Sequence, residues 1–270
     1  MRIEVQHLTH FRFAGPSSMS LHQCRLMPVP GLDQRILHWE IRTPGRPRDW
    51  VDGYGNTVRA FSVTETHQEV EILAKGTFEW MQGQSAYLSH NDPEALPPLY
   101  WLRNHGLARY DADIEAFVAD LKPHGSVPGE RVAVLHELML RIKKRVEYRV
   151  GATDVEVGAA EALKRGTGVC QDHAHLFTAC CRAVGIPARY VSGYLRVHDE
   201  LLGPASHAWA EAFIPDLGWV GFDPANGICP TGEHLKLAIG LDYGEAAPVA
   251  GRRFGGGAAE MRVEVQVRAL

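Results

Sequence analysis

The stretch that decides the fold is GTGVCQDHAHLFTACCRAVGIPARYVSGYL, residues 166–195. After a glycine-rich turn, apolar residues recur mostly at steps of three and four over about 171–184, as they do in a helix with a buried face. A glycine and a proline end that pattern, and residues 188–195 are rich in Val and Tyr, as strands are. The stretch therefore predicts a turn, a helix and a strand, with Cys170 at the start of the helix.

A cysteine at a helix N-terminus has a chemical consequence. The first backbone N–H groups of a helix have no partner within it, and the helix dipole is positive at that end. Both effects favour the thiolate over the thiol, which makes a cysteine nucleophilic near neutral pH. Cys170 is therefore a candidate nucleophile, and the rest of the chain has to supply its base.

The candidate base is His207, at the start of the strand expected over 206–214. Asp223 closes the next expected strand, 219–223, and a short turn between the two strands brings their far ends together. A carboxylate bonded to one imidazole nitrogen leaves the other nitrogen to face the thiol, which activates a Cys–His pair. Each residue alone has an ordinary structural interpretation, whereas the three together favour a thiol triad.

Size and composition exclude several classes of protein. The chain has 270 residues, 45% of them hydrophobic and 22% charged, as in soluble globular proteins of one or two domains. A net charge of −4 gives no basic field for nucleic acid, and no apolar run of about 18 residues predicts a membrane span. Five cysteines without a secretory leader predict reduced thiols and a cytoplasmic location. Without a CxxC pair, and with 14 scattered histidines, we expect no structural zinc site. We also expect no cofactor.

The order of elements predicts three parts and an α+β fold. Residues 1–83 are expected to form an antiparallel β-sandwich or barrel module, residues 84–98 a linker, and residues 99–270 a core in which helices precede an antiparallel run of strands. The first part is expected to hold strands 2–13, 20–27, 35–42, 57–65 and 68–80, with a turn at Gly15 and Pro16. The core is expected to hold helices after Asp111 and over 130–146, 159–164 and 235–240, and a closing strand at 261–268.

Four segments also resemble the bacterial transglutaminase-like proteins: GVCQDHAH (168–175), GIPARYVSGY (185–194), SHAWAE (206–211) and GWVGFDPAN (218–226). The resemblance spans about 130–227, and residues 9–13 and 20–28 resemble the N-terminal β module of that family. It implies a papain-like core with Cys170 as nucleophile, His207 as base and acid, and Asp223 as the residue that orients His207. One departure is His173, where relatives often have Phe or Tyr; we expect a polar replacement on the helix surface.

The implied reaction is acyl transfer from a peptide or amide through a thioester on Cys170. Hydrolysis is the leading interpretation, protein-glutamine cross-linking is the alternative, and a non-catalytic scaffold is a third. The triad is the same for the first two, since only the access of water or amine to the thioester differs. Competent residues at all three positions argue against the scaffold. Substrate identity and oligomeric state stay open.

Four further residues are candidates for supporting roles. Tyr148 is either a second oxyanion donor or a core tyrosine, because its segment precedes the nucleophile. Trp209 shares a strand face with His207, where it shields the imidazole from water or simply packs in the sheet. Gln171 and Asp172 are expected to cap the first helical turn; tuning of the thiol by Asp172 is the less favoured role.

Overall fold

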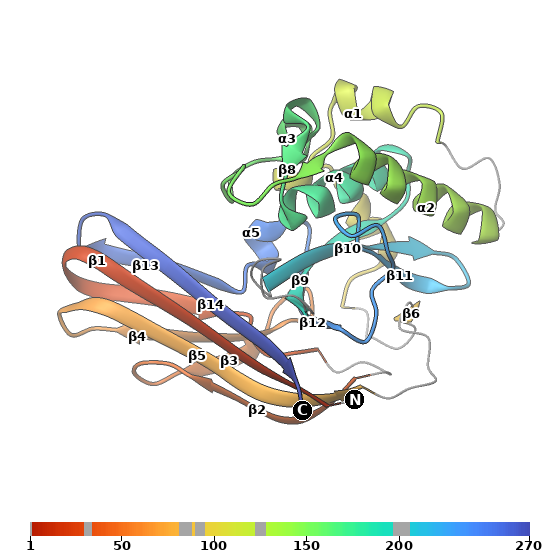
Figure 1. Ribbon diagram of the computed structural model, residues 1–270. Helices are drawn as coiled ribbons and strands as arrows, with labels where there is room; N and C mark the ends of the chain where they lie inside the picture. The colour runs from red at the N-terminus through yellow and green to blue at the C-terminus, as the bar shows by residue number, and fades with distance from the viewer. Residues whose placement is uncertain (1, 30–33, 81–87, 90–94, 122–127, 197–205) are drawn as a thin grey trace.

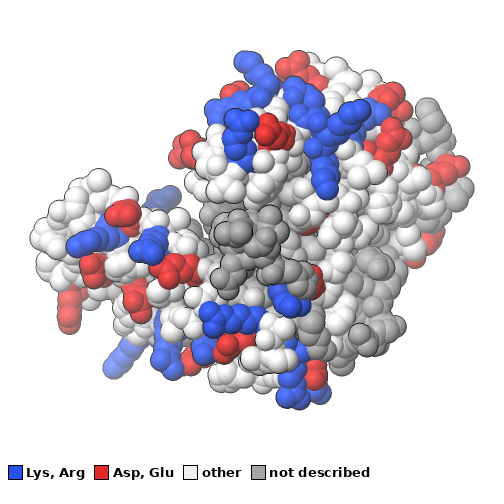
Figure 2. All heavy atoms as spheres, in the orientation of Figure 1, with Lys and Arg blue, Asp and Glu red and all other residues white. Residues whose placement is uncertain are grey.

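The computed structural model describes residues 2–29, 34–80, 88–89, 95–121, 128–196 and 206–270. It has the expected α+β organisation (Figure 1). A curled antiparallel sheet forms one side of the molecule, and helices packed on a second, smaller sheet form the other. Figure 2 shows basic and acidic side chains interspersed on the visible face of both parts.

The curled sheet is built around one long strand, β1 (Arg2–Cys24). Alternate residues of its first half are buried, as the two-residue period of a strand requires. The other strands of this sheet are β2 (Gln34–Arg42), β3 (Arg48–Val51), β4 (Thr57–Val63), β5 (His67–Trp80), β13 (Val249–Gly255) and β14 (Ala259–Ala269). The first half of β1 pairs mainly with β5 and β14, and its second half pairs mainly with β4 and β13.

Two expectations about this sheet were wrong. Gly15 and Pro16 do not end a strand, because β1 runs through them with a shift in its pairing with β5 between Arg12 and Ser17. Because the regular pairing of the strands is interrupted there, the N–H that proline lacks leaves no inter-strand hydrogen bond unmade. The closing strand, which we grouped with the core, is β14, and it pairs with β1 along residues 3–13. Its alternate valines pack on the apolar cluster of the curled sheet, which accounts for the difference.

The second sheet has the order β12–β9–β10–β11–β6. Its members are β6 (Leu88–Ser89), β9 (Ala188–Leu195), β10 (Ser206–Ile214), β11 (Gly218–Phe222) and β12 (His234–Gly240). The segment of β12 was expected to be a helix. It is buried on both faces, so its apolar residues do not alternate and its sequence lacks the pattern of a half-exposed strand. Most of the predicted linker, 84–98, lies outside the described residues.

Helices cover one face of the second sheet. The central helix, α4 (Cys170–Ala183), lies between the sheet and the other helices and is buried almost throughout (Figure 1). The surrounding elements are α1 (Ala112–Phe117), α2 (Pro128–Arg145), α3 (Ala159–Arg165), α5 (Tyr243–Ala246) and the 3₁₀ turns Pro98–Leu102 and Gly106–Ala108. Asp111 caps α1 through its carboxylate, as expected.

Two buried side chains fix how the parts fit together. The guanidinium of Arg182, near the end of α4, donates to four backbone carbonyls, those of Trp101, Ala108, Ala188 and Leu241. At the junction of the two sheets, the amide of Asn56 donates to the carbonyl of Ile239 at 2.8 Å and accepts from its N–H at 2.8 Å. The Asn56 side chain thus takes the place of a pairing strand beside β12.

Candidate active site

The turn before α4 places Cys170 as the first residue of the helix. Asp172 holds this turn, since its Oδ2 accepts the backbone N–H of Val169 at 2.7 Å and the hydroxyl of Thr153 at 2.6 Å. A Cβ at position 168 would lie 2.7 Å from the Cβ of Asp172, so the glycine there allows the close approach. These are capping contacts, and they leave the Cys170 N–H at a helix end without an acceptor in its own helix.

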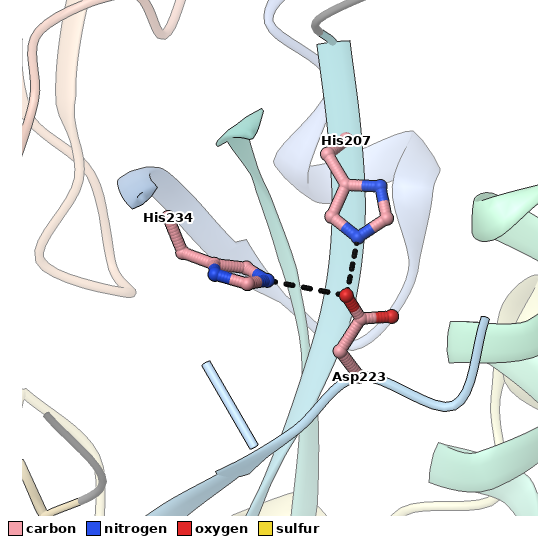
Figure 3. A group of neighbouring side chains, drawn as sticks. All are labelled: His207, Asp223 and His234. Atoms are coloured by element: carbon pink, nitrogen blue, oxygen red, sulfur yellow. Dashed lines mark hydrogen bonds and ion pairs between the residues drawn. The ribbon is translucent and has the colours of Figure 1, made fainter. Parts of the chain in front are cut away.

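His207 and Asp223 meet at the ends of two neighbouring strands. His207 is the second residue of β10, and Asp223 directly follows β11, which pairs antiparallel with β10. The Nε2 of His207 lies 2.7 Å from the Oδ2 of Asp223, and the other ring nitrogen points away from the carboxylate (Figure 3). The strand topology that predicted this meeting from the sequence is the one that the structure shows.

A second histidine, His234, also binds Asp223. Its Nε2 lies 3.1 Å from the same Oδ2 (Figure 3), and its Nδ1 accepts the backbone N–H of Thr231 at 3.0 Å. Because Nδ1 accepts, the ring proton sits on Nε2 and His234 donates to the carboxylate. Sequence reasoning missed His234, since its segment was expected to be a helix; a strand beside β9 would have placed it near His207.

The carboxylate of Asp223 is completely buried and fully engaged. Besides the two histidines, the side-chain amide of Asn226 donates to Oδ2 at 2.7 Å, and its backbone N–H donates to Oδ1 at 3.2 Å. Burial raises the pKa of Asp223, but the hydrogen bonds with His207 and His234 outweigh it and hold the pKa well below the usual range. Asp223 is therefore an anion at neutral pH.

The imidazole of His207 responds to this anion and to the thiol. Burial alone lowers the pKa of His207, yet side-chain hydrogen bonds with Asp223 and Cys170 outweigh burial and raise the pKa to about 10. Since Nε2 is taken by Asp223, Nδ1 is the nitrogen left to face Cys170. Cys170 thus lies close enough to influence an imidazole that Asp223 holds.

Cys170 and His207 open onto a cavity of about 330 Å³. Tyr148 lines the same cavity, because β7 (Glu147–Tyr148) pairs in parallel with β8 (Thr167–Gly168), just before the nucleophile. Burial, together with the charges of Cys170 and Asp223, raises the pKa of Tyr148 to about 12. Its phenol therefore keeps its proton and can donate a hydrogen bond into the cavity.

The other predicted supporting residues lie close to this group. The Trp209 ring is buried, and its centre lies 6.3 Å from the centre of the His207 ring and 5.3 Å from that of the His234 ring. The indole therefore covers both imidazoles. Glycine at position 193 makes room for it, since a Cβ there would come within 2.5 Å of the indole. The Gln171 side chain lines the cavity and donates to the carbonyl of Val155 at 3.0 Å.

The expectation for His173 was wrong, because this residue is buried and not on the helix surface. Its two ring nitrogens lie 2.8 Å from the carbonyl oxygen of Val169 and 3.0 Å from that of Val146. The imidazole lies between the start of α4 and the end of α2, and a ring N–H can donate to one of these carbonyls, which a Phe could not do.

The ligand atoms of His207, Asp223 and His234 lie within 4.8 Å of one another, which is close enough to consider a metal. The hydrogen bonds give a different account of the group. A metal on His234 Nε2 would displace the proton that the Thr231 N–H fixes there. The arrangement instead suits a carboxylate that orients two imidazoles.

Comparison with known proteins agrees with this geometry. Residues 126–224 match the model of the transglutaminase-like superfamily, and residues 3–79 match that of the bacterial transglutaminase-like N-terminal region. An uncharacterised protein of Mycobacterium tuberculosis is 32% identical over 93% of this chain and 87% of its own length. The chain belongs to the transglutaminase-like superfamily.

Two further comparisons concern this superfamily. A crystal structure of a proposed cysteine protease from Cytophaga hutchinsonii superimposes with a TM-score of 0.77, covering 100% of this chain and 91% of that one at 23% identity, so the two share a fold. A protein-glutamine gamma-glutamyltransferase of Pseudomonas aeruginosa is 33% identical over 33% of this chain and 15% of its own length. Among the described residues, no helix is both long and apolar enough to cross a membrane.

Proposed function

We propose that this transglutaminase-like chain is a thiol-dependent amide or peptide hydrolase with Cys170, His207 and Asp223 as its catalytic triad. The observation that carries the proposal is the connected group itself. A buried, ionised Asp223 holds one nitrogen of His207, while His207 is hydrogen-bonded to a cysteine at a helix N-terminus. That arrangement favours a thiolate beside an imidazolium.

In the proposed reaction, the thiolate of Cys170 attacks the carbonyl carbon of the substrate. The Cys170 N–H, at the helix start, donates a hydrogen bond to the developing oxyanion, and the phenol of Tyr148 is our candidate for the second donor. The imidazolium of His207 gives its proton to the departing amine or ammonia, and a thioester remains. Water then attacks the thioester as His207 takes its proton, and Cys170 leaves as the thiolate, which releases the acid and restores the thiolate–imidazolium pair.

The alternative is transfer of the acyl group to an amine, as a protein-glutamine acyltransferase would do. The similarity to the Pseudomonas aeruginosa enzyme, which covers 33% of this chain, supports this alternative. The same triad serves both reactions, and the second substrate decides between them. A non-catalytic scaffold has less support, because a scaffold has no use for an ionised carboxylate–imidazole pair beside a thiol.

The first experiment tests the nucleophile. With limiting iodoacetamide at pH 6–7, Cys170 should be alkylated faster than Cys229. Cys229 is the comparison because it is also partly exposed, while burial raises the pKa of its thiol. Mass spectrometry of the digested protein gives both rates. Cys170→Ala should melt cooperatively and release no amine from peptide amides, whereas Cys229→Ala should keep the activity. Equal rates of alkylation, or an active Cys170→Ala protein, would refute the proposal.

A second experiment separates hydrolysis from transfer. Ammonia release from glutamine peptides is measured with and without a primary amine, and the products are weighed by mass spectrometry. We expect the free acid in both cases; an amine adduct as the main product would favour the acyltransferase. We also keep the cytoplasm as the predicted compartment, since reduced thiols suit it, and cell fractionation tests that prediction.

A further inference from the structure

The cavity above Cys170 lies between the two parts of the chain. One wall comes from the core and contains Tyr148 and the turn that leads into α4. The opposite wall comes from the curled sheet, where His7 and Thr9 of β1 and Met261 and Val263 of β14 line the cavity. Thr9 pairs directly with Val263, so these two strands present a continuous surface to the nucleophile.

Apart from Cys170 and His207, the lining of this cavity carries no formal charge among the residues that the structure describes. None of them is Asp, Glu, Lys or Arg. His7 is neutral, because burial lowers its pKa to about 4, and its ring nitrogens are engaged by the hydroxyls of Tyr194 and Thr9 at 2.7 and 2.8 Å. The charged residues of β14 alternate with Met261 and Val263 and therefore face the other side of the strand; Arg262 and Glu264 form an ion pair there at 2.9 Å.

The curled sheet also leaves apolar surface uncovered at this wall. Met261 is 49% exposed and Val263 is 40% exposed, whereas the polar residues His7 and Thr9 on the paired strand β1 are buried. An apolar side chain bound there would cover this surface and gain the free energy of burial. A charged side chain would lose its hydration there without meeting a counter-charge on this wall, which is costly. A cavity of about 330 Å³ is at the small end of ligand sites, so it suits one side chain and the amide attached to it.

From this we infer that the curled sheet selects the acyl side of the substrate, and that Met261 and Val263 select an uncharged, apolar side chain next to the bond that is cleaved. The inference rests on the proposed function, because it needs Cys170 to be the nucleophile. It gives the sheet a role that the triad does not supply: the triad recognises any carbonyl, and the wall opposite Cys170 recognises what the carbonyl carries.

The test uses N-acetyl amino acid chloromethyl ketones, which place a side chain on the acyl side of an electrophilic carbon. The thiolate forms a C–S bond and chloride leaves, so labelling needs no turnover. Second-order rates at Cys170 are measured by mass spectrometry for reagents with Leu, Glu and Lys side chains. We expect the Leu reagent to react at least about tenfold faster than the Glu and Lys reagents, as expected for discrimination by an apolar pocket.

A charge placed on the wall should change that order. Val263→Lys should speed labelling by the Glu reagent relative to the Leu reagent by about tenfold, because the ammonium supplies the missing counter-charge. Phe254→Lys is the matched control, since Phe254 is 60% exposed on the neighbouring strand β13 and does not line the cavity. It should leave the order of the three reagents unchanged.

The outcomes separate the two proposals. If Cys170 reacts rapidly but at equal rates with all three reagents, or if Val263→Lys and Phe254→Lys behave alike, the inference about the wall is wrong and the nucleophile stands. If Cys170 reacts no faster than Cys229 with any reagent, the proposed function is wrong and the inference fails with it.

Discussion

At the scale of single residues, Asp223 is the most constrained group in the candidate site. One carboxylate oxygen receives N–H groups from His207, His234 and Asn226, and the side chain is entirely buried. Hydrogen bonds to an ionised acceptor are stronger than those between neutral groups. Three such bonds fix the carboxylate, and the carboxylate in turn fixes the plane of the His207 ring that faces the thiol.

His234 should act as a positioning residue. His234→Leu removes a donor from a buried anion, an interaction of about 1.5–3 kcal/mol, and should lower kcat roughly 10- to 100-fold with little change in KM. His234→Gln can still donate to Asp223 and should recover most of the loss. Steady-state kinetics on the best peptide amide measure both variants. Equal losses for Leu and Gln would show that the volume of the ring matters and its hydrogen bond does not.

His207 gives a prediction about stability and pH. Its pKa of about 10 in the folded protein lies above the ordinary value of 6.5, so the folded state binds this proton more tightly than the unfolded state. The stability that His207 contributes is therefore fully present below about pH 6.5 and is lost as the pH rises toward 10. Urea unfolding should show the wild type and His207→Gln differing most near pH 6 and converging by pH 10. A difference that grows with pH would contradict the proposed ion pair.

Sequence reasoning at this scale reached the three central residues and missed the fourth. Cys170, His207 and Asp223 could be placed because each stands at the end of a regular element, where topology decides what it meets. His234 could not, since its position depends on the turn that begins at Thr231 and on a strand that was expected to be a helix. The parallel pairing that brings Tyr148 to the cavity involves two short segments with no periodic pattern.

At the scale of elements, the first turn of α4 controls where the thiol lies. The cap depends on Asp172 accepting the Val169 N–H and the Thr153 hydroxyl. Asp111 makes a similar cap on α1, where it accepts the N–H groups of Asp113 and Ile114. Asp172 and Asp111 are thus two caps of the same residue type, one beside the cavity and one at another helix.

We expect these caps to differ in their effect on chemistry. Asp172→Ala and Asp111→Ala should each lower the free energy of unfolding by about 1–2 kcal/mol, the usual cost of losing a cap. Only Asp172→Ala should also slow alkylation of Cys170 by iodoacetamide, because only that cap fixes the helix start that carries the thiol. The checks are urea titration and mass spectrometry. If Asp111→Ala slowed alkylation equally, general loosening of the fold would explain both results.

The elements most easily predicted were those with one buried face. The strands β9 and β10 have the expected bounds, and α1 to α4 lie within a few residues of theirs. The strand β12 was missed because both of its faces are buried, so burial leaves no alternation to detect. β13 was missed because it is mostly exposed. We divided β1 into two strands because Gly15 and Pro16 indicate a turn, but they lie where the pairing of β1 with β5 shifts.

At the scale of the whole molecule, the junction between the two sheets sets the width of the cavity, since each sheet supplies one wall. The buried side chain of Asn56 holds this junction through two hydrogen bonds to the backbone of Ile239. Asn104 makes the same pair of bonds to the backbone of Tyr110, but at an exposed site. The two residues share their chemistry and differ in burial.

Asn56→Ala should therefore be much more damaging than Asn104→Ala. Losing Asn56 leaves the partly buried N–H and carbonyl of Ile239 without this partner, at a cost of up to about 1–3 kcal/mol for each, whereas water replaces the bonds that Asn104 makes. Chemical unfolding of both variants measures the difference. Asn56→Ala should also weaken the preference for the Leu chloromethyl ketone, as the wall opposite Cys170 shifts. Similar stability losses for the two variants would argue that Asn56 does not hold the junction.

The three-part division of the sequence, at 83 and 98, stays a prediction. Hydrogen bonding shows why it is hard to draw from the sequence: strands from the last quarter of the chain complete a sheet that the first residues begin. Local patterns report that residues 261–268 form a strand, but they do not report which sheet the strand joins. That choice depends on contacts between residues some 250 positions apart.

The pairing of β14 with β1 also sets an order of events during synthesis. A ribosome translates Cys170, His207 and Asp223 before it reaches Met261 and Val263. A nascent chain therefore holds all three residues of the proposed triad while the surface opposite the thiol is still missing. If the wall selects the substrate, the growing polypeptide acquires selectivity only after β14 has left the exit tunnel and paired with a strand made at the very start of translation.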